Sequence, residues 1–331
     1  MQEIDFSEIE GVFVGNSQNN EAKTGVTVFY FPHTAMGGVH ISGGGPASRE
    51  TPVLDPERAD TPVNALVLGG GSAYGLAASD GVMRFLEQNK IGFNTRVALV
   101  PIVVQSDIYD LGYGRSDIRP DSNMGMEACW AALSASGKIS SEKPASSNEI
   151  TVGAKNGNYG GGTGATVGKI CGPERMQKSG IGFAAFQVGE LKIGAAVVLN
   201  AFGDIYFEGK KIAGLLSEDK KSFTDSVQEL YKIRSPQNQF NSRENTTIGA
   251  IFTNGNFTKA QLKKIANMAT AAYDRGIRPV GTMGDGDTIY AFSCAAKENQ
   301  IQADLNVAGT LAAQTMELAI KNAIQGVGSA C

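Results

Sequence analysis

The feature that most constrains the fold of this chain is an abrupt change of character at residue 245. A polar stretch with one proline, residues 234–245, is followed at once by the apolar, β-branched segment TTIGAIFT at 246–253. A short apolar run of this kind is typical of a strand buried on both faces, which needs further layers to cover it. The polar stretch is predicted to be an exposed loop. Thr246 is therefore expected where a surface loop enters a buried strand.

Thr246 gains a special chemistry if the chain cuts itself at the Asn245–Thr246 bond. The new terminus would carry a hydroxyl and a free α-amine on one residue, so that nucleophile and base come together. A free α-amine has a reference pKa of about 7.7–8.0, which suits a general base near neutral pH. The alternative is a threonine that simply begins a strand, and by residue type alone this is far more common.

Composition narrows the class of protein. The chain has 331 residues, 42% of them hydrophobic and 19% charged, which is typical of a globular protein with a large core. A net charge of −4 without a basic stripe argues against a nucleic-acid partner. Four scattered cysteines without a CxxC pair argue against a disulfide framework or zinc site and favour a cytoplasmic protein. No apolar run suggests a signal peptide or a membrane span, so no membrane partner is expected.

Histidine is scarce, with only His33 and His40 in the chain. Neither stands in the spacing of paired metal ligands, so a histidine-based triad or metal site is poorly supported. We expect no metal and no organic cofactor. The acid–base group of an enzyme built from this chain is expected to be an amine, a carboxylate, a lysine or a tyrosine.

Hydrophobic periodicity predicts strands interleaved with helices in a single layered α/β or α+β domain. Expected strands lie at 26–31, 64–69, 97–104 with a break at Pro101, 180–188, 192–200, 203–208, 246–253 and 288–294. Expected helices follow residue 72 and lie at 122–136, 225–233, 258–274 and 304–324. Ser72, Ser122 and Thr258 are predicted to be helix N-caps.

Glycine is abundant, with 42 residues and runs at 43–45, 69–71 and 160–162. These runs suggest closely packed layers and a cleft lined by backbone. They do not match nucleotide-binding motifs. Tyr74 interrupts both GxGxxG and GxSxG after the second run, and no Ser or Thr follows Lys169 as a P-loop requires.

Other polar residues leave two interpretations open. Asp285 and Asp287 flank Gly286, and in an extended segment both carboxylates would face one side; a simple turn is the alternative. Asn200 ends a predicted strand, where an amide can donate to an oxyanion or merely terminate the strand. By residue type alone, Lys169 and Tyr109 would be surface residues.

Five segments in order carry a resemblance that extends from about residue 11 to the last helix. They are 63–78 (VNALVLGGGSAYGLAA), 160–169 (GGGTGATVGK), 199–204 (LNAFGD), 245–254 (NTTIGAIFTN) and 278–291 (RPVGTMGDGDTIYA). Together they resemble the self-processing aminopeptidase family of L-aminopeptidase/D-esterases, β-peptidyl aminopeptidases and nylon-oligomer endohydrolases. The resemblance is specific for the family and less so for the substrate.

The resemblance implies an αββα sandwich like that of N-terminal-nucleophile hydrolases but with different connectivity. It implies one domain, 1–331, self-cleaved into 1–245 and 246–331 and assembled into homo-oligomers, often tetramers. The substrates would be small peptides, amino-acid amides or esters, or ω-amino acid (nylon) oligomers. Two rivals remain: an acyltransferase of the ornithine acetyltransferase type, and an uncleaved, non-enzymatic binding protein.

The resemblance also implies a role for each matching residue. Thr246 would be the nucleophile and, through its freed amine, the base. Asn200 would stabilise the oxyanion, and Lys169 would lie near the nucleophile. Tyr109 would belong to the substrate pocket. The remaining pair, Asp285 and Asp287, would orient the nucleophile and its amine.

Overall fold

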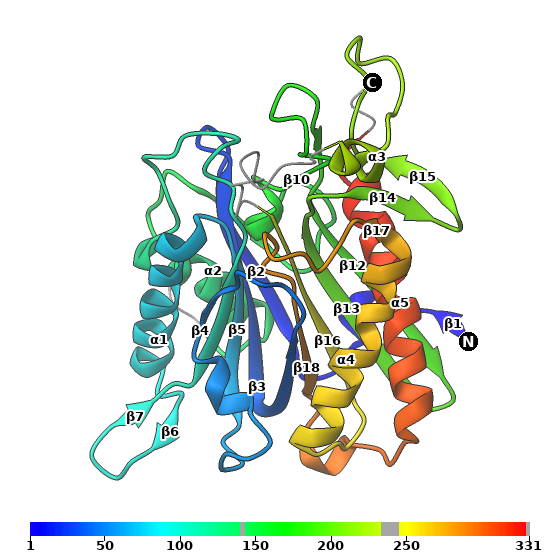
Figure 1. Ribbon diagram of the computed structural model, residues 1–331. Helices are drawn as coiled ribbons and strands as arrows, with labels where there is room; N and C mark the ends of the chain where they lie inside the picture. Colours follow the sequence, from blue (N-terminus) through cyan, green and yellow to red (C-terminus); the bar gives the residue numbers. More distant parts are fainter. Residues whose placement is uncertain (140–142, 233–244, 329–331) are drawn as a thin grey trace.

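Two β-sheets lie face to face between two layers of helices in this computed structural model (Figure 1), which describes residues 1–139, 143–232 and 245–328. Their common member is β3 (Thr24–Ile41), a strand of 18 residues. Its first half pairs with strands of one sheet and residues 36–41 pair with the other. The pairing register shifts between Tyr30 and Ala35, where the strand passes from one sheet to the next.

The first sheet contains the first half of β3 and five other strands. Its pairs are antiparallel except for the parallel pair β5–β8. The strands are β2 (Phe13–Asn19), β4 (Ala47–Arg49), β5 (Val63–Gly69), β8 (Val103–Asp107) and β9 (Glu149–Val152). Helices α1 (Ala78–Gln88) and α2 (Ser122–Ala135) cover its outer face, at the left of Figure 1.

The second sheet runs in the order β1, β12, β13, β16, β18 and the second half of β3. These strands are β1 (Gln2–Glu3), β12 (Ile181–Val188), β13 (Leu191–Asn200), β16 (Thr246–Thr253) and β18 (Thr288–Ser293). Helices α4 (Lys259–Gly276) and α5 (Leu305–Gln325) cover its outer face, at the right of Figure 1. No helix within the described ranges is long and apolar enough to cross a membrane.

Three apolar layers hold the sandwich together. Strand β16 shows how sequence alternation divides them, because successive side chains of a strand point to opposite faces. Ile248, Ala250 and Phe252 pack between the two sheets, whereas Ile251 packs against the helices α4 and α5. The predicted αββα architecture is confirmed.

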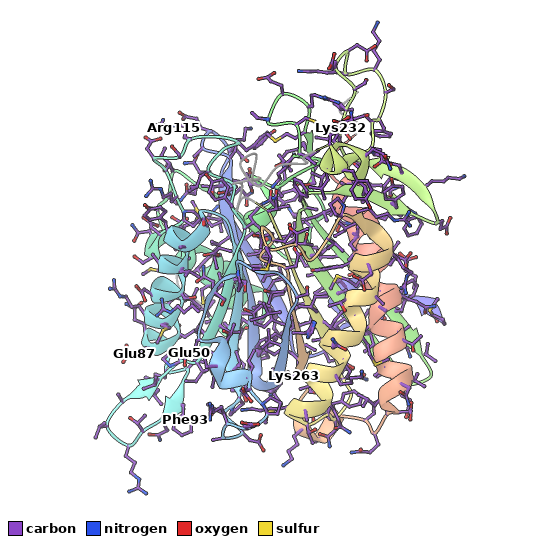
Figure 2. The ribbon with its side chains drawn as sticks, in the orientation of Figure 1. Glu50, Glu87, Phe93, Arg115, Lys232 and Lys263 are labelled. Carbon is purple, nitrogen blue, oxygen red and sulfur yellow. The ribbon has the colours of Figure 1, made fainter. Side chains whose placement is uncertain are left out.

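Shorter elements complete the chain. Figure 1 shows β10, β14, β15, β17 and α3 gathered at one end of the sandwich. The short strands are β6 (Phe93–Asn94), β7 (Leu99–Val100), β10 (Thr166–Val167), β11 (Gln177–Lys178), β14 (Asp204–Phe207), β15 (Lys210–Ala213) and β17 (Ile277–Arg278). The short helices are α3 (Ser226–Tyr231) and the 3₁₀ turns η1 (Phe6–Glu8), η2 (Thr51–Leu54), η3 (Ser72–Ala77), η4 (Gly160–Gly162) and η6 (Lys297–Asn299). Figure 2 shows the charged side chains Glu87 and Arg115 at the periphery.

Two predicted helix caps are wrong. Ser72 does not cap the helix after it: it begins η3 with φ 54, and the N-cap, Gly71, makes no side-chain bond. At α2 the cap is Asp121, whose carboxylate accepts from the Met124 N–H, and Ser122 is the first helical residue. Thr258 caps α4 as predicted, through a capping box with Gln261. The predicted loop 234–245 lies outside the described residues except for Asn245.

Candidate active site

Thr246 and Asn200 lie side by side because the register of two central strands makes them direct partners. Thr246 begins β16, Asn200 ends β13, and the two are opposite each other in the antiparallel pair. By strand alternation Thr246 shares the face of Ile248, which packs between the sheets. Thr246 is 5% exposed and Asn200 is fully buried. The site is therefore at the end of the layer between the two sheets.

The peptide bond before Thr246 is held by two donors. The Thr246 hydroxyl donates to the carbonyl oxygen of Asn245 at 2.5 Å, and the backbone N–H of Gly286 donates to the same oxygen at 2.9 Å. A Cβ at position 286 would lie 2.8 Å from Thr246 Oγ1, so glycine is required for this close approach. Gly286 was missed in the sequence, although it is the central residue of the Asp-Gly-Asp motif.

Asp285 and Asp287 form both a turn and a buried pair of carboxyl groups. The N–H of Asp285 donates to the Thr282 carbonyl at 3.1 Å, which closes the turn. Asp287 accepts from the N–H of Thr247 at 2.7 Å and of Gly281 at 3.0 Å, so it ties the start of β16 to the loop 281–286. The two interpretations of the motif are thus compatible.

Burial governs the protonation of this pair. Loss of solvent, and next the charge of Asp285, raise the pKa of Asp287 to about 7, against the effect of its two N–H donors. Burial also raises the pKa of Asp285, while its bonds to Thr282 and the charge of Lys169 act in the opposite direction. The proton of Asp287 is therefore retained up to about neutral pH, and its loss depends on the charge of Asp285.

Lys169 fixes the amide of Asn200. Its Nζ donates to Asn200 Oδ1 at 2.6 Å and to the Asn200 carbonyl oxygen at 3.1 Å, and the N–H of Thr166 also donates to Oδ1 at 3.1 Å. Because two donors hold the amide oxygen, the amide nitrogen is directed to the other side. There it donates to the carbonyl oxygen of Tyr109 at 3.0 Å.

A cavity of about 280 Å³ opens beside this group. Tyr109, Tyr113, Thr166, Lys169 and Met176 line it. Its aromatic and apolar walls with a few polar groups are typical of a small-molecule site. A larger cavity of about 720 Å³ is lined by residues such as Phe6, Val12 and His33 and contains none of the predicted site residues.

The structure thus gathers the residues that the sequence singled out. Thr246, Asn200 and Lys169 are linked by strand register and hydrogen bonds, Asp285 and Asp287 join through Asn245 and Thr247, and Tyr109 contacts Asn200 through its backbone. In the described part of the chain, no three His, Cys, Asp or Glu side chains are close enough together to hold a metal. The arrangement is suited to acyl transfer: a hydroxyl, donors for an oxyanion, and two buried carboxyl groups whose pKa is raised.

Comparison with known families and sequences supports this chemistry. Residues 5–330 match peptidase family S58. The chain is 35% identical over 290 residues to an uncharacterized aminopeptidase of Mycobacterium leprae. This alignment covers 86% of this chain and 74% of that protein. It is 28% identical over 288 residues to a 6-aminohexanoate-oligomer endohydrolase of Kocuria. That alignment covers 85% of this chain and 72% of the relative.

Comparison with solved structures supports the fold. An L-aminopeptidase D-Ala-esterase/amidase of Ochrobactrum anthropi, described as a variant of the Ntn hydrolase fold, aligns with a TM-score of 0.64 at 20% identity. The alignment covers 95% of this chain and 84% of that one. A β-aminopeptidase of Burkholderia aligns with a TM-score of 0.60 at 19% identity, over 95% and 84% of the two chains.

Proposed function

Because the chain belongs to peptidase family S58 and has a variant of the Ntn hydrolase fold, we propose that it is a self-processing amide hydrolase whose nucleophile is Thr246. The observation that carries the proposal is the convergence of two donors, Thr246 Oγ1 and the Gly286 N–H, on the carbonyl oxygen of Asn245. The short distance between Thr246 Oγ1 and this carbonyl group supports cleavage of the Asn245–Thr246 bond by Thr246. The single domain 1–331 would become two chains, 1–245 and 246–331.

In the proposed self-cleavage, Thr246 Oγ1 attacks the carbonyl carbon of Asn245. The Gly286 N–H stabilises the charge that develops on the carbonyl oxygen. The C–N bond then breaks, the hydroxyl proton passes to the departing nitrogen, and an ester joins Asn245 to Thr246. One water molecule hydrolyses this ester, leaving a carboxylate on Asn245 and a free amine and hydroxyl on Thr246.

In the proposed mature enzyme, the amine of Thr246 removes the proton from its own hydroxyl, which attacks a substrate carbonyl. Asn200 Nδ2 would then donate to the oxyanion, a contribution that is typically about 2.7–4 kcal/mol for one donor. Lys169 holds Asn200 in the orientation that this requires. Asp285 and Asp287 position the start of β16 and take part in proton transfer.

The proposed substrates are amides and esters of small amino acids, short peptides, and oligomers of ω-amino acids. Relatives named as an aminopeptidase and as 6-aminohexanoate-oligomer endohydrolases support this range. The 280 Å³ cavity with Tyr109 in its wall offers room for a small acyl or amine group. We also propose that cleaved protomers assemble into a homo-oligomer such as a tetramer, as the family resemblance implies. The scattered cysteines support a cytoplasmic location for it.

A panel of aminoacyl p-nitroanilides and 6-aminohexanoate oligomers tests the proposal. Wild-type protein should hydrolyse at least one member, and Thr246→Ala should hydrolyse none. Thr246→Ser is the matched control, because it keeps the hydroxyl and should retain activity. Hydrolysis by purified Thr246→Ala protein would remove Thr246 from the nucleophile role. Adding ornithine to the assay reveals any acyl transfer to an amine in place of water.

A further inference from the structure

Two glycine-containing segments, around Gly70 and Gly164, lack the spacing of phosphate-binding motifs. Instead, they pack closely against the carboxyl group of Asp110. A Cβ at Gly70 would lie 2.0 Å from Asp110 Oδ2. A Cβ at Gly164 would lie 2.5 Å from Asp110 Cβ and 2.7 Å from Oδ2. Since any side chain at either position would displace Asp110, the two segments are shaped to hold this residue.

Asp110 is bound through both of its oxygen atoms. Thr24 Oγ1 donates to Oδ2 at 2.7 Å, and the N–H of Gly71 donates to Oδ1 at 2.7 Å. The residue is 4% exposed. Burial raises the pKa of Asp110 to about 6, against the effect of Thr24, Gly71 and the charge of Lys169. At neutral pH it is therefore mainly a carboxylate, which suits its two donors.

The backbone next to Asp110 reaches the proposed oxyanion donor. Tyr109 precedes Asp110, and its carbonyl oxygen accepts from Asn200 Nδ2 at 3.0 Å. On the other side of Tyr109, the N–H of Ile108 donates to the Gly69 carbonyl at 2.8 Å, and the Ile108 carbonyl accepts from the Ser72 N–H at 2.9 Å. The carbonyl of Tyr109 is thus held between two anchors, of which the Asp110 carboxylate is one.

We propose that Asp110 is a positioning residue for the oxyanion donor Asn200. By fixing the segment 108–110 against Thr24 and the two glycine segments, Asp110 places the Tyr109 carbonyl where it orients Asn200 Nδ2. Asp110 also presents its negative charge to Lys169, which holds the other side of the same amide. The inference rests on the proposed function, in which Asn200 stabilises the oxyanion.

Asp110→Asn tests the proposal with little change of shape. The new amide oxygen can accept from Gly71, and the Thr24 hydroxyl can turn to accept from the new N–H₂ group, so the charge is the main loss. Thr24→Val is a second variant that keeps the charge and removes one bond. The matched control is Thr315→Val: Thr315 is also buried and bonded, to the Leu311 carbonyl at 2.7 Å, but it lies in α5.

The steady-state constants kcat and KM are measured separately for each variant on one active ester or anilide. A misplaced catalytic group typically costs on the order of 100-fold in rate, so we expect Asp110→Asn to lower kcat roughly 30- to 100-fold with KM changed less than about threefold. Thr24→Val should lower kcat about three- to tenfold, and Thr315→Val should leave it unchanged. If Asp110→Asn does not fold, Thr24→Val decides: an unchanged kcat there overturns the proposal.

The decisive readout is a double-mutant cycle with Asn200→Ala. Residues that act through one another are not additive, so Asp110→Asn should cost less than about twofold once Asn200 is already alanine. An equal loss in both backgrounds, or a wild-type kcat in Asp110→Asn, would overturn the inference. An active wild type with either of these results leaves the proposed function standing. An inactive wild type overturns the proposed function and the inference together.

Discussion

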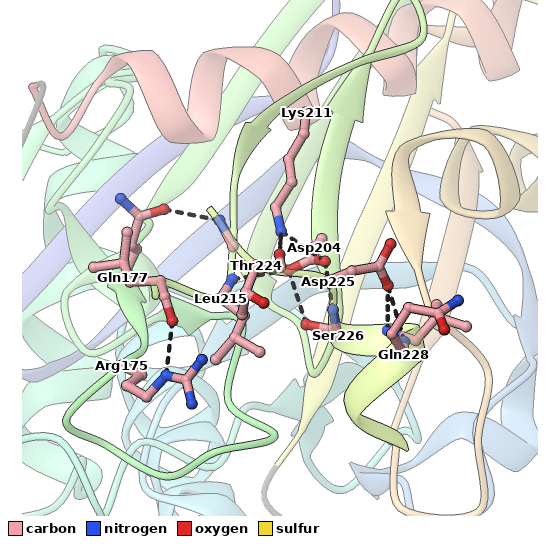
Figure 3. Close-up of polar contacts among 12 residues, drawn as sticks. Arg175, Gln177, Asp204, Lys211, Leu215, Thr224, Asp225, Ser226 and Gln228 are labelled. Atoms are coloured by element: carbon pink, nitrogen blue, oxygen red, sulfur yellow. Dashed lines mark hydrogen bonds and ion pairs between the residues drawn. The ribbon is translucent and has the colours of Figure 1, made fainter. Parts of the chain in front are cut away.

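Two aspartates of this molecule, Asp204 and Asp287, are equally buried but have opposite charges beside them: Asp204 has a cation as its neighbour, and Asp287 has a second carboxyl group. Each is 1% exposed. Asp204 forms an ion pair with Lys211 at 2.8 Å and accepts from Leu215 N–H, Ser226 N–H and Ser226 Oγ (Figure 3). Asp287 accepts from two backbone N–H groups and has a second carboxyl group, Asp285, as its charged neighbour.

The difference separates a carboxylate that stabilises the fold from one to which the proposed function assigns a role in proton transfer. At Asp204 a cation and three donors compensate the buried charge, so the residue ties β14 to β15 and to the start of α3. At Asp287 burial and a like charge favour the protonated form, which is the usual situation of groups that exchange protons in active sites. Burial alone therefore does not identify a functional carboxylate.

The largest effect is expected when the charge of Asp287 is removed. Asp287→Asn should slow self-cleavage and turnover at least about 100-fold, because the proton-accepting group and one anchor of Thr247 are altered together. Its thermal stability should also fall, because the amide group has only one acceptor oxygen and cannot accept from both Thr247 and Gly281 as the two carboxylate oxygens do, although the like charge beside Asp285 is lost. Densitometry of cleaved and intact chains over time measures the first effect. A cleavage rate within threefold of wild type would contradict the claim that Asp287, unlike Asp204, takes part in the reaction.

A somewhat smaller effect is expected at Gly286. Gly286→Ala places a methyl group 2.8 Å from Thr246 Oγ1, so we expect self-cleavage to slow about 10- to 100-fold. Gly45→Ala is the matched control in a neighbouring loop, because nothing lies closer than 3.9 Å to its new Cβ. Equal rates of self-cleavage in the two variants would contradict the proposed role of the Gly286 N–H, which is to stabilise the charge on the Asn245 carbonyl oxygen.

At Asp204 the expected loss is in stability and not in chemistry. Asp204→Ala removes a buried carboxylate, so that the partly buried Lys211 loses its ion pair and the N–H groups of Leu215 and Ser226 lose their acceptor. Breaking a buried pair typically costs about 3–5 kcal/mol. The free energy of unfolding from urea titration should therefore drop, while the fraction that remains folded should still cleave itself. Loss of cleavage in well-folded Asp204→Ala protein would place Asp204 in the reaction as well.

The pH dependence of stability should reveal the raised pKa of Asp287. The pKa of Asp287 in the folded chain, about 7, lies above the roughly 3.9 of an unfolded aspartate. Between these values the folded state binds the extra proton, so Asp287 adds stability at low pH that is lost as the pH rises through about 7. In a Thr246→Ala background, which keeps the chain whole, Asp287→Asn should reduce the fall of Tm from pH 5 to pH 8. The same slope with and without Asp287 would contradict the raised pKa.

The sequence predicts the elements of the sandwich better than their junctions. The strand 246–253 has the predicted bounds because its apolar run is short and sharply limited. By contrast, the predicted strand 26–31 is only part of β3, since the passage of one strand between two sheets depends on partners that are distant in sequence. The prediction that Ser72 is a helix cap was wrong because the chain turns at Gly71 and Ser72, which both have positive φ, and local pattern did not indicate this turn.

The candidate site shows the same limit. Motifs and resemblance identified Thr246, Asn200 and the two aspartates, but the contact between Thr246 and Asn200 follows from strand register, which local pattern does not fix. The sequence did not indicate Gly286 and Asp110 because their roles depend on contacts with residues that are distant in sequence. The sequence does not show that the N–H of Gly286 lies beside a peptide carbonyl, or that two glycine loops hold the carboxylate of Asp110.

Intact mass and N-terminal sequencing of freshly purified protein test the central claim most directly. Cleavage before Thr246 would divide the 331 residues into chains of 245 and 86 residues. Scaled by length from 34.7 kDa, they should weigh about 26 and 9 kDa, and the smaller should begin Thr-Thr-Ile-Gly. Thr246→Ala protein should stay at 34.7 kDa. A wild-type chain that remains whole for days, or a smaller fragment that begins at another residue, would contradict the account.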